Sequence, residues 1–233
     1  MTPFSLPLDS WPHPVRTGAG RKDCDGSAGA VERVGVYDLR VLILFAPGAG
    51  APSTSPWMNR WAARLGSLGE VVPFDYPYTK AGRRSPDRLP VLVAAHRAAL
   101  AEVQAAHGGA VVLAGKSMGS RVGCHVALES SVTALVCLGY PLRGQRGELR
   151  SEVLLALRTP ILFVQGTRDA LCPLDALEDV RRRMTAPSAL HAVQGGNHSL
   201  EVGVRELRAR GETQEDVDAR ALAAIRDFAA AQL

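Results

Sequence analysis

A serine between two glycines follows a short apolar run in this chain: residues 110–119 read AVVLAGKSMG, with Ser117 between Gly115 and Gly119. The G-x-S-x-G spacing is typical of a nucleophile elbow, a strand-to-helix turn so tight that side chains at the flanking positions would collide with neighbouring backbone. Such a turn presents the serine hydroxyl at the end of a sheet. An ordinary strand, turn and helix with an incidental serine matches the same pentapeptide, so the motif needs partner residues.

Two later segments supply candidate partners. Residues 160–166, PILFVQG, form a continuous apolar run, which predicts a strand buried on both faces and places Asp169 just past its end. Residues 191–199, HAVQGGNHS, predict a short strand whose Gly-Gly-Asn turn leads to His198. The resulting order of serine, aspartate and histidine is the order found in α/β-hydrolases, and it differs from the orders in the two well-known serine protease classes.

Side-chain chemistry predicts one role for each of these residues. A serine hydroxyl is a poor nucleophile near neutral pH, so we expect His198 to take the proton of Ser117 as general base and to return it to the leaving group. Asp169 would hold the imidazole in the required tautomer. Asp175 is the substitute if Asp169 only caps its turn, and a surface loop histidine is the alternative for His198.

The oxyanion hole is predicted from the elbow and from an earlier glycine-rich turn. Residues 47–50 read PGAG and follow the apolar strand predicted at residues 41–46. We expect the backbone N–H groups of Ala49 and Met118 to point at the developing oxyanion. A flexible turn without this role is the alternative.

Six motifs carry a family resemblance: FAPGAG, FDYPY, GKSMGSR, LGYPL, QGTRDALCP and GGNHSL. Over about Val41 to Leu233 the chain resembles the small α/β-hydrolases related to testis-expressed protein thirty and the dienelactone hydrolase-like group. The resemblance implies a serine hydrolase of unassigned substrate, with Ser117, Asp169 and His198 as its triad. Pro47 stands where many hydrolases have a histidine, which leaves the backbone donors as the expected oxyanion hole. One relative in this broad group is a chromatin-complex subunit, so the fold alone does not imply catalysis.

Composition limits the remaining classes. The chain has 233 residues, 46% hydrophobic and 21% charged, which predicts one domain with a substantial core. Apolar runs stay short of the ~20 residues that a membrane span needs. The N-terminus has neither a basic n-region nor an apolar h-region, and the four cysteines show no framework spacing, so we expect reduced thiols and a cytoplasmic location.

The formal charge of +4 raises the question of nucleic acid, because Arg181, Arg182 and Arg183 form a basic run. Only 5% of residues are aromatic and no binding motif accompanies the run, so we interpret it as a solvated helix face and expect neither nucleic-acid nor membrane partners. A second group of arginines lies on loops near the predicted sheet ends, where it would attract anionic substrates. This group is Arg83, Arg84, Arg143, Arg146 and Arg150.

Strand and helix patterns alternate along the chain, which predicts an α/β-hydrolase fold with a mostly parallel central sheet and helices on both faces. Strands are expected at residues 31–36, 41–46, 70–74, 110–114, 134–138, 160–166 and within 191–199. Helices are expected at residues 57–68 (capped by Ser55), 89–107, 120–128, 151–157, 174–184 and 213–232. Residues 1–30 are predicted to be an irregular or disordered lead, and 31–233 a single domain.

Only some twenty residues separate the strands ending near Leu138 and starting near Pro160, so little or no lid is expected. The substrate-pocket candidates are Tyr76, Tyr78, Tyr140 and Leu142, together with Met118, and ordinary packing is the alternative for each. Lys116 is expected to meet a substrate anion or, more simply, to form a surface salt bridge. We interpret His96 and His125 as helix residues with satisfied hydrogen bonds.

These features predict a serine-dependent acyl hydrolase, resembling a carboxylesterase or thioesterase, that acts on a small ester or thioester through an acyl-enzyme without metal or organic cofactor. A peptidase or amidase would use the same residues. The alternative from another class is an interaction protein of hydrolase fold that has no significant turnover. The oligomeric state and the physiological substrate are not predicted.

Overall fold

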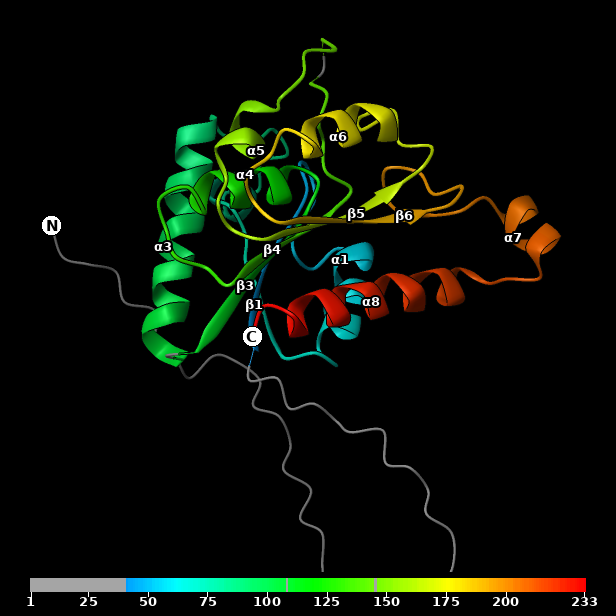
Figure 1. The fold of residues 1–233 in the computed structure, drawn as a ribbon. Coiled ribbons are helices and arrows are strands. Elements are labelled where there is room, and N and C mark those ends of the chain that lie inside the picture. The colour runs from blue at the N-terminus through cyan, green and yellow to red at the C-terminus, as the bar shows by residue number, and fades with distance from the viewer. Residues whose placement is uncertain (1–40, 108, 145) are drawn as a thin grey trace, which may run out of the picture. The chain divides into compact units, whose positions relative to one another are not determined.

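Six parallel strands form one sheet in the order β2-β1-β3-β4-β5-β6. The computed structural model describes residues 41–233 except Gly108 and Gln145; the predicted lead at residues 1–30 and the predicted strand at 31–36 lie outside these residues. The strands are β1 (Val41–Ala46), β2 (Glu70–Pro73), β3 (Ala110–Lys116), β4 (Ala134–Leu138), β5 (Ile161–Gly166) and β6 (Ser188–Val193). Every pair of neighbours is parallel, so all carboxyl ends share one edge of the sheet (Figure 1).

The central strands are apolar along their whole length because both faces of the sheet are covered. β1, β4 and β5 are buried at every position, as a strand with helices on both sides must be. The helices are α1 (Pro56–Leu65), α2 (Pro77–Lys80), α3 (Leu89–His107), α4 (Met118–Val126), α5 (Glu152–Ala156), α6 (Leu174–Arg181), α7 (Val204–Arg210) and α8 (Gln214–Ala230).

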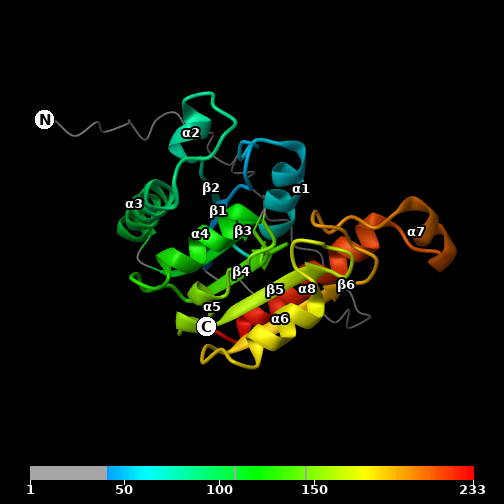
Figure 2. The ribbon, with the colours of Figure 1, turned by 90° about the horizontal axis from the view of Figure 1, so that it is seen from above.

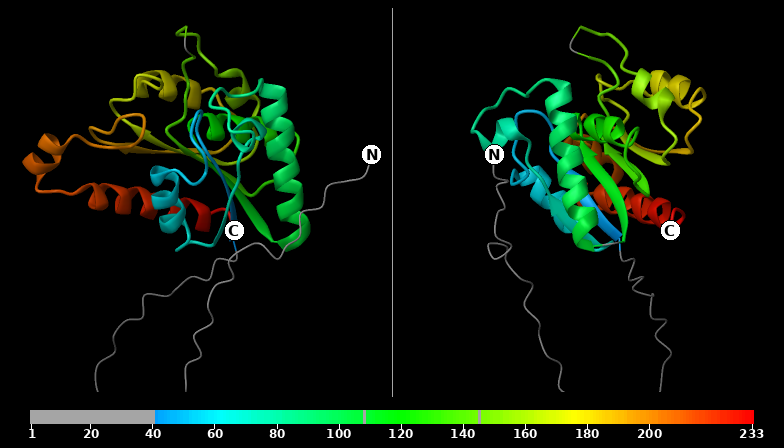
Figure 3. Two further views of the ribbon diagram at one scale, coloured as in Figure 1. Left: turned by 180° about the vertical axis from the view of Figure 1, so that it is seen from behind. Right: turned by 90° about the vertical axis from the view of Figure 1, so that its left-hand side faces the viewer.

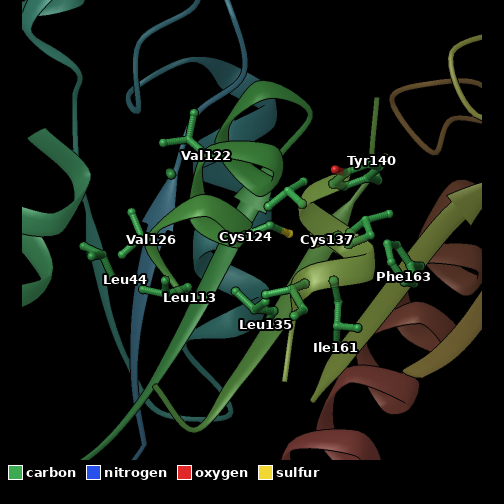
Figure 4. Packing of buried hydrophobic residues seen from close by; sticks show 14 of the residues in the cluster. Leu44, Leu113, Val122, Cys124, Val126, Leu135, Cys137, Tyr140, Ile161 and Phe163 are labelled. Atoms are coloured by element: carbon green, nitrogen blue, oxygen red, sulfur yellow. The ribbon is translucent and has the colours of Figure 1, made fainter. Parts of the chain in front are cut away.

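Two hydrophobic clusters divide these helices between the faces of the sheet. The first cluster contains buried residues of α3, α4, α5 and α6, and the second contains those of α1, α7 and α8. Views from above and from behind show α4 lying over the middle of the sheet and α1 and α8 on the opposite face (Figures 2 and 3). In the first cluster, Val122, Cys124 and Val126 of α4 pack on Leu113 and Leu135 of the strands beneath (Figure 4).

The predicted α/β-hydrolase architecture is confirmed, and the differences lie at element ends and in short helices. α1 ends at Leu65 instead of residue 68, because the N–H groups of Ser67 and Leu68 donate to carbonyls only three residues back, as in a turn, and Ser55 makes no side-chain cap. α4 begins at Met118 instead of Ser120, since Ser117 is itself the cap residue. α6 stops at Arg181 and β6 starts at Ser188, earlier than expected.

Two helices were not predicted from the sequence. α2 is a four-residue helix, too short to show a period. α7 buries only Leu207, so its charged sequence carries no apolar stripe. The described residues between β4 and β5 form one small hairpin, closed by the bridge between Arg143 and Leu149, and the short helix α5. This short insertion agrees with the expected lack of a substantial lid.

Candidate active site

The strand-to-helix turn at Ser117 has the geometry of a nucleophile elbow. Ser117 has φ 49° and ψ −112°, a region that non-glycine residues rarely occupy. A Cβ atom at Gly115 would lie 2.3 Å from the backbone nitrogen of Ser120, and one at Gly119 would lie 2.5 Å from the carbonyl oxygen of Ala46. Only glycine fits at either position, because real Cβ atoms do not approach backbone this closely. The tight turn predicted from the G-x-S-x-G spacing is therefore present.

Three side chains from separate loops form one hydrogen-bonded row. The Nε2 atom of His198 lies 2.8 Å from Oγ of Ser117, and its Nδ1 atom lies 2.7 Å from Oδ2 of Asp169. An ionised carboxylate only accepts hydrogen bonds, so Nδ1 carries the hydrogen and Nε2 is free to accept from the serine hydroxyl. The row thus presents the imidazole in the tautomer that a general base for Ser117 needs.

Asp169 is buried and held from several sides. It is 3% exposed, and its side chain accepts hydrogen bonds from Nε2 of Gln165 at 2.5 Å and from the N–H of Leu171 at 2.9 Å. Both bonds orient the carboxylate toward His198. Asp175 instead lies in the first turn of α6, where its Oδ1 accepts from the N–H of Ala176 at 2.8 Å. The substitute acid considered from the sequence is therefore not the partner of His198.

A buried lysine braces the backbone of the histidine. Lys116, the last residue of β3, is 9% exposed, and its Nζ donates to the carbonyl oxygen of His198. The same ammonium lies 5.3 Å from the ring centroid of Trp57, whose Nε1 donates to the carbonyl of Ser199 at 3.0 Å. Burial lowers the pKa of Lys116 to about 8. The predicted surface salt bridge of Lys116 is wrong, because its ammonium turns inward beneath the histidine loop.

A cavity of about 390 Å³ opens beside the serine. Its lining includes Ser117 together with Ala49 and Met118, the two residues proposed for the oxyanion hole. The rest of the wall is partly apolar and partly basic. It comprises Pro86, Asp87, Leu89, Leu92, Arg121, Val122, Pro141, Arg143, Arg150 and Leu171. Sequence reasoning missed the contribution of α3 and of Arg121, because no local pattern tells which helix end faces the elbow.

The four pocket candidates Tyr76, Tyr78, Tyr140 and Leu142 do not line this cavity. All four have no exposed surface. The hydroxyl of Tyr78 accepts from the N–H of Gly50 at 3.3 Å, and Tyr140 packs edge-on against Phe163 at a centroid distance of 5.7 Å (Figure 4). Their prediction as pocket residues is wrong here, since the chain after β2 and β4 turns these side chains into the core under the loops.

The ring nitrogens of the two helix histidines, His96 and His125, do not all have hydrogen-bond partners. Nδ1 of His96 lies 3.3 Å from the hydroxyl of Tyr76, whereas its Nε2 and that of His125 are buried without a hydrogen-bond partner among residues 41–233 as described. His96 is fully buried, and desolvation lowers its pKa to about 3. Both histidines lie outside the row that contains Ser117, and His96 is a neutral core residue.

The fold and this row of residues define a member of the α/β-hydrolase class. A family model described as an alpha/beta hydrolase domain matches residues 39–230, and the chain belongs to that family. None of the described helices is both long and apolar enough to cross a bilayer.

Solved structures with the same fold come from several bacteria. An alpha-beta serine hydrolase homologue from Coxiella burnetii is 18% identical, with a TM-score of 0.62 over 84% of this chain and 86% of its own. The RedJ thioesterase of the prodiginine pathway in Streptomyces coelicolor is 19% identical, with a TM-score of 0.58 over 81% and 86%. A dienelactone hydrolase from Anabaena variabilis is 21% identical, with a TM-score of 0.57 over 69% and 77%. At these identities the likeness concerns the fold.

Proposed function

We propose that this protein is a serine-dependent acyl hydrolase that cleaves a small ester or thioester through an acyl-enzyme. The observation that carries the proposal is the hydrogen-bonded row, with 2.8 Å between Ser117 Oγ and His198 Nε2 and 2.7 Å between His198 Nδ1 and Asp169 Oδ2. Nucleophile, base and orienting carboxylate stand in the order that acyl transfer requires.

Each chemical step uses groups that lie in or beside the cavity. Oγ of Ser117 attacks the acyl carbon as its proton passes to Nε2 of His198, and the N–H groups of Ala49 and Met118 would hold the oxyanion. Collapse of the tetrahedral intermediate breaks the bond to the leaving group, which takes the proton from His198. A water molecule activated by His198 then attacks the acyl-enzyme and releases the acid and the free serine.

Several observations support an ester or thioester as the substrate of this site. The cavity volume of about 390 Å³ lies near the lower end of the range for small-molecule sites, which favours a small-molecule acyl substrate. Proteins of the same fold include one named as a thioesterase and one named as a dienelactone hydrolase. The free thiols of Cys124, Cys137 and Cys172 support the cytoplasmic location that we propose.

A fluorophosphonate probe tests the proposal directly, because it reacts with an activated serine. We expect labelling at Ser117 in the wild-type protein and none in Ser117→Ala. His198→Ala should lose both labelling and hydrolysis of p-nitrophenyl hexanoate. If the folded wild-type protein is neither labelled nor active on such esters, the proposed hydrolase activity is refuted. That result would favour an interaction protein of hydrolase fold.

A further inference from the structure

The cavity beside Ser117 is lined by three arginines from two parts of the fold. Arg121 lies on α4, one turn after the nucleophile, whereas Arg143 and Arg150 flank the small hairpin that follows β4. Three arginines against one aspartate, Asp87, give the cavity wall an excess of positive charge. Arg143 and Arg150 were expected near the sheet end from the sequence, whereas Arg121 was not.

The acidic groups nearby leave most of this charge unbalanced. Asp87 also lines the cavity, but its Oδ1 pairs with Arg83 at 2.7 Å. Arg150 pairs with Glu148 at 3.1 Å. Within the part of the chain that the structure describes, neither Arg121 nor Arg143 has an acidic partner within 4.0 Å. Neither guanidinium is in an ion pair, although the charge of Glu152 acts on Arg121 from a longer distance and Oδ2 of Asp87 is buried in the cavity wall without a hydrogen-bond partner in the described residues.

Arg121 is the arginine whose burial is least compensated by hydrogen bonds. Its Nε is buried without a hydrogen-bond partner in the described residues. Desolvation is the main cause that lowers its pKa, and the like charge of Arg150 lowers it further. A guanidinium stays protonated in proteins, so it cannot escape this cost by losing a proton. A bound carboxylate would relieve it, because a carboxylate matches the planar fork of guanidinium donors.

The cavity adjoins the nucleophile and the two expected oxyanion donors, so it has room for the acyl group. Its lining includes Ser117, Ala49 and Met118, whereas His198, which must protonate the leaving group, is not among the lining residues. Apolar side chains of Leu89, Leu92 and Val122 complete the wall and suit a short methylene chain.

We propose that the substrate is an ester or thioester whose short acyl chain ends in a carboxylate, which Arg121 binds with help from Arg143 and Arg150. This inference rests on the proposed acyl hydrolase activity and names the acyl group that the site takes.

The test compares two p-nitrophenyl esters of equal chain length. Mono-p-nitrophenyl adipate carries the terminal carboxylate, and p-nitrophenyl hexanoate has a methyl group in its place; the six-carbon chain avoids the spontaneous anhydride formation of shorter monoesters. We expect wild-type kcat/KM for the adipate to exceed that for the hexanoate by tenfold or more. Arg121→Met should reduce this ratio by about tenfold to a hundredfold, as expected for loss of a hydrogen-bonded charge partner, and Arg121→Lys should retain part of it.

Arg205→Met is the matched control, because Arg205 is an exposed arginine on α7 outside the cavity lining, and the ratio should not change. The double variant Arg143→Met with Arg150→Met repeats the test on the hairpin without altering α4, so a misfolded Arg121 variant still leaves a decisive measurement. Labelling of Ser117 together with equal rates on the two esters would overturn this inference and leave the proposed hydrolase in place. Unchanged selectivity in folded Arg121→Met and in the double variant would overturn it too. A wild-type protein with no labelling and no hydrolysis of either ester would overturn both proposals.

Discussion

Lys116 donates a hydrogen bond from Nζ to the backbone carbonyl of His198, so the residue before the nucleophile holds the loop of the base. Two hydrogen bonds thus join the elbow to His198: one from the hydroxyl of Ser117 to the imidazole ring, and one from the ammonium of Lys116 to the backbone carbonyl. The indole N–H of Trp57 donates a further hydrogen bond to the next residue of this loop, at the carbonyl of Ser199. The histidine loop is therefore fixed by β3 and α1 as well as by Asp169.

Lys116→Met should reduce kcat/KM on a neutral ester by about tenfold, because the histidine loop loses one hydrogen bond that positions the imidazole. Steady-state kinetics on p-nitrophenyl hexanoate measures this loss.

Lys116→Met should also change the pH dependence of stability. Burial lowers the pKa of Lys116 to about 8 in the folded protein, against about 10.4 in an unfolded chain, so the unfolded state binds more protons between these values. The free energy of unfolding of the wild-type protein should therefore rise with pH between about 8 and about 10.4, relative to Lys116→Met.

Urea unfolding at several pH values measures this difference, and Lys80→Met is the control because Lys80 is exposed at the end of α2. Parallel pH profiles of wild type and Lys116→Met would show that the buried ammonium does not titrate as described.

Asp169→Asn should reduce kcat by about a thousandfold or more, because an amide at this position no longer favours the tautomer in which Nε2 of His198 accepts from Ser117. Asp175→Asn should leave kcat within about twofold, since its carboxylate only accepts from the first turn of α6. Steady-state kinetics on p-nitrophenyl hexanoate compares the two variants. An inactive Asp175→Asn beside an active Asp169→Asn would reverse the assignment of the acid.

Ser117→Gly should be more stable than Ser117→Ala, although glycine is normally the less stable of the two. At φ 49° and ψ −112° a side chain costs about 1–3 kcal/mol, which exceeds the entropic cost of glycine of about 0.5–1 kcal/mol. Both variants should be inactive, so thermal unfolding is the measurement. A lower melting temperature for the glycine variant would argue against backbone strain at the nucleophile.

His96→Leu should make the protein less sensitive to acid. His96 stays neutral in the fold because its pKa is about 3, whereas the unfolded histidine takes up a proton below about pH 6.5. Stability is therefore lost as pH falls from about 6.5 toward about 3, by up to about 1.4 kcal/mol per pH unit. The slope of unfolding free energy against pH should therefore be smaller in His96→Leu than in the wild-type protein, which urea unfolding at several pH values between about 3 and about 6.5 measures.

The elbow and its partners were predictable because local chemistry specifies them. Gly115 and Gly119 are required by backbone approaches inside one turn, and Asp169 and His198 each follow an apolar strand that ends at the same edge of the sheet. The helix at residues 89–107 was also predicted to its end residues, since the Gly108–Gly109 pair marks a stop that tertiary packing did not override.

The cavity wall was not predictable because it depends on how distant segments meet. Tyr76 and Tyr140 follow strands and look accessible in the sequence, yet the loops direct them into the core. Lys116 reads as a surface cation, and only the approach of the histidine loop reveals its acceptor. Arg121 looks like an ordinary helix residue until the hairpin after β4 brings Arg150 toward it.

Strand order has a practical consequence for how this protein would lose activity. Ser117 follows β3 in the interior of the sheet, whereas Asp169 and His198 follow β5 and β6, the last two strands on one side, with β6 at the margin. Margins of a sheet open at lower free energy than its centre, so partial unfolding there removes acid and base together while the nucleophile stays in place. During gradual denaturation, the reactivity of Ser117 would then fall before spectroscopic signals that average over the whole molecule change.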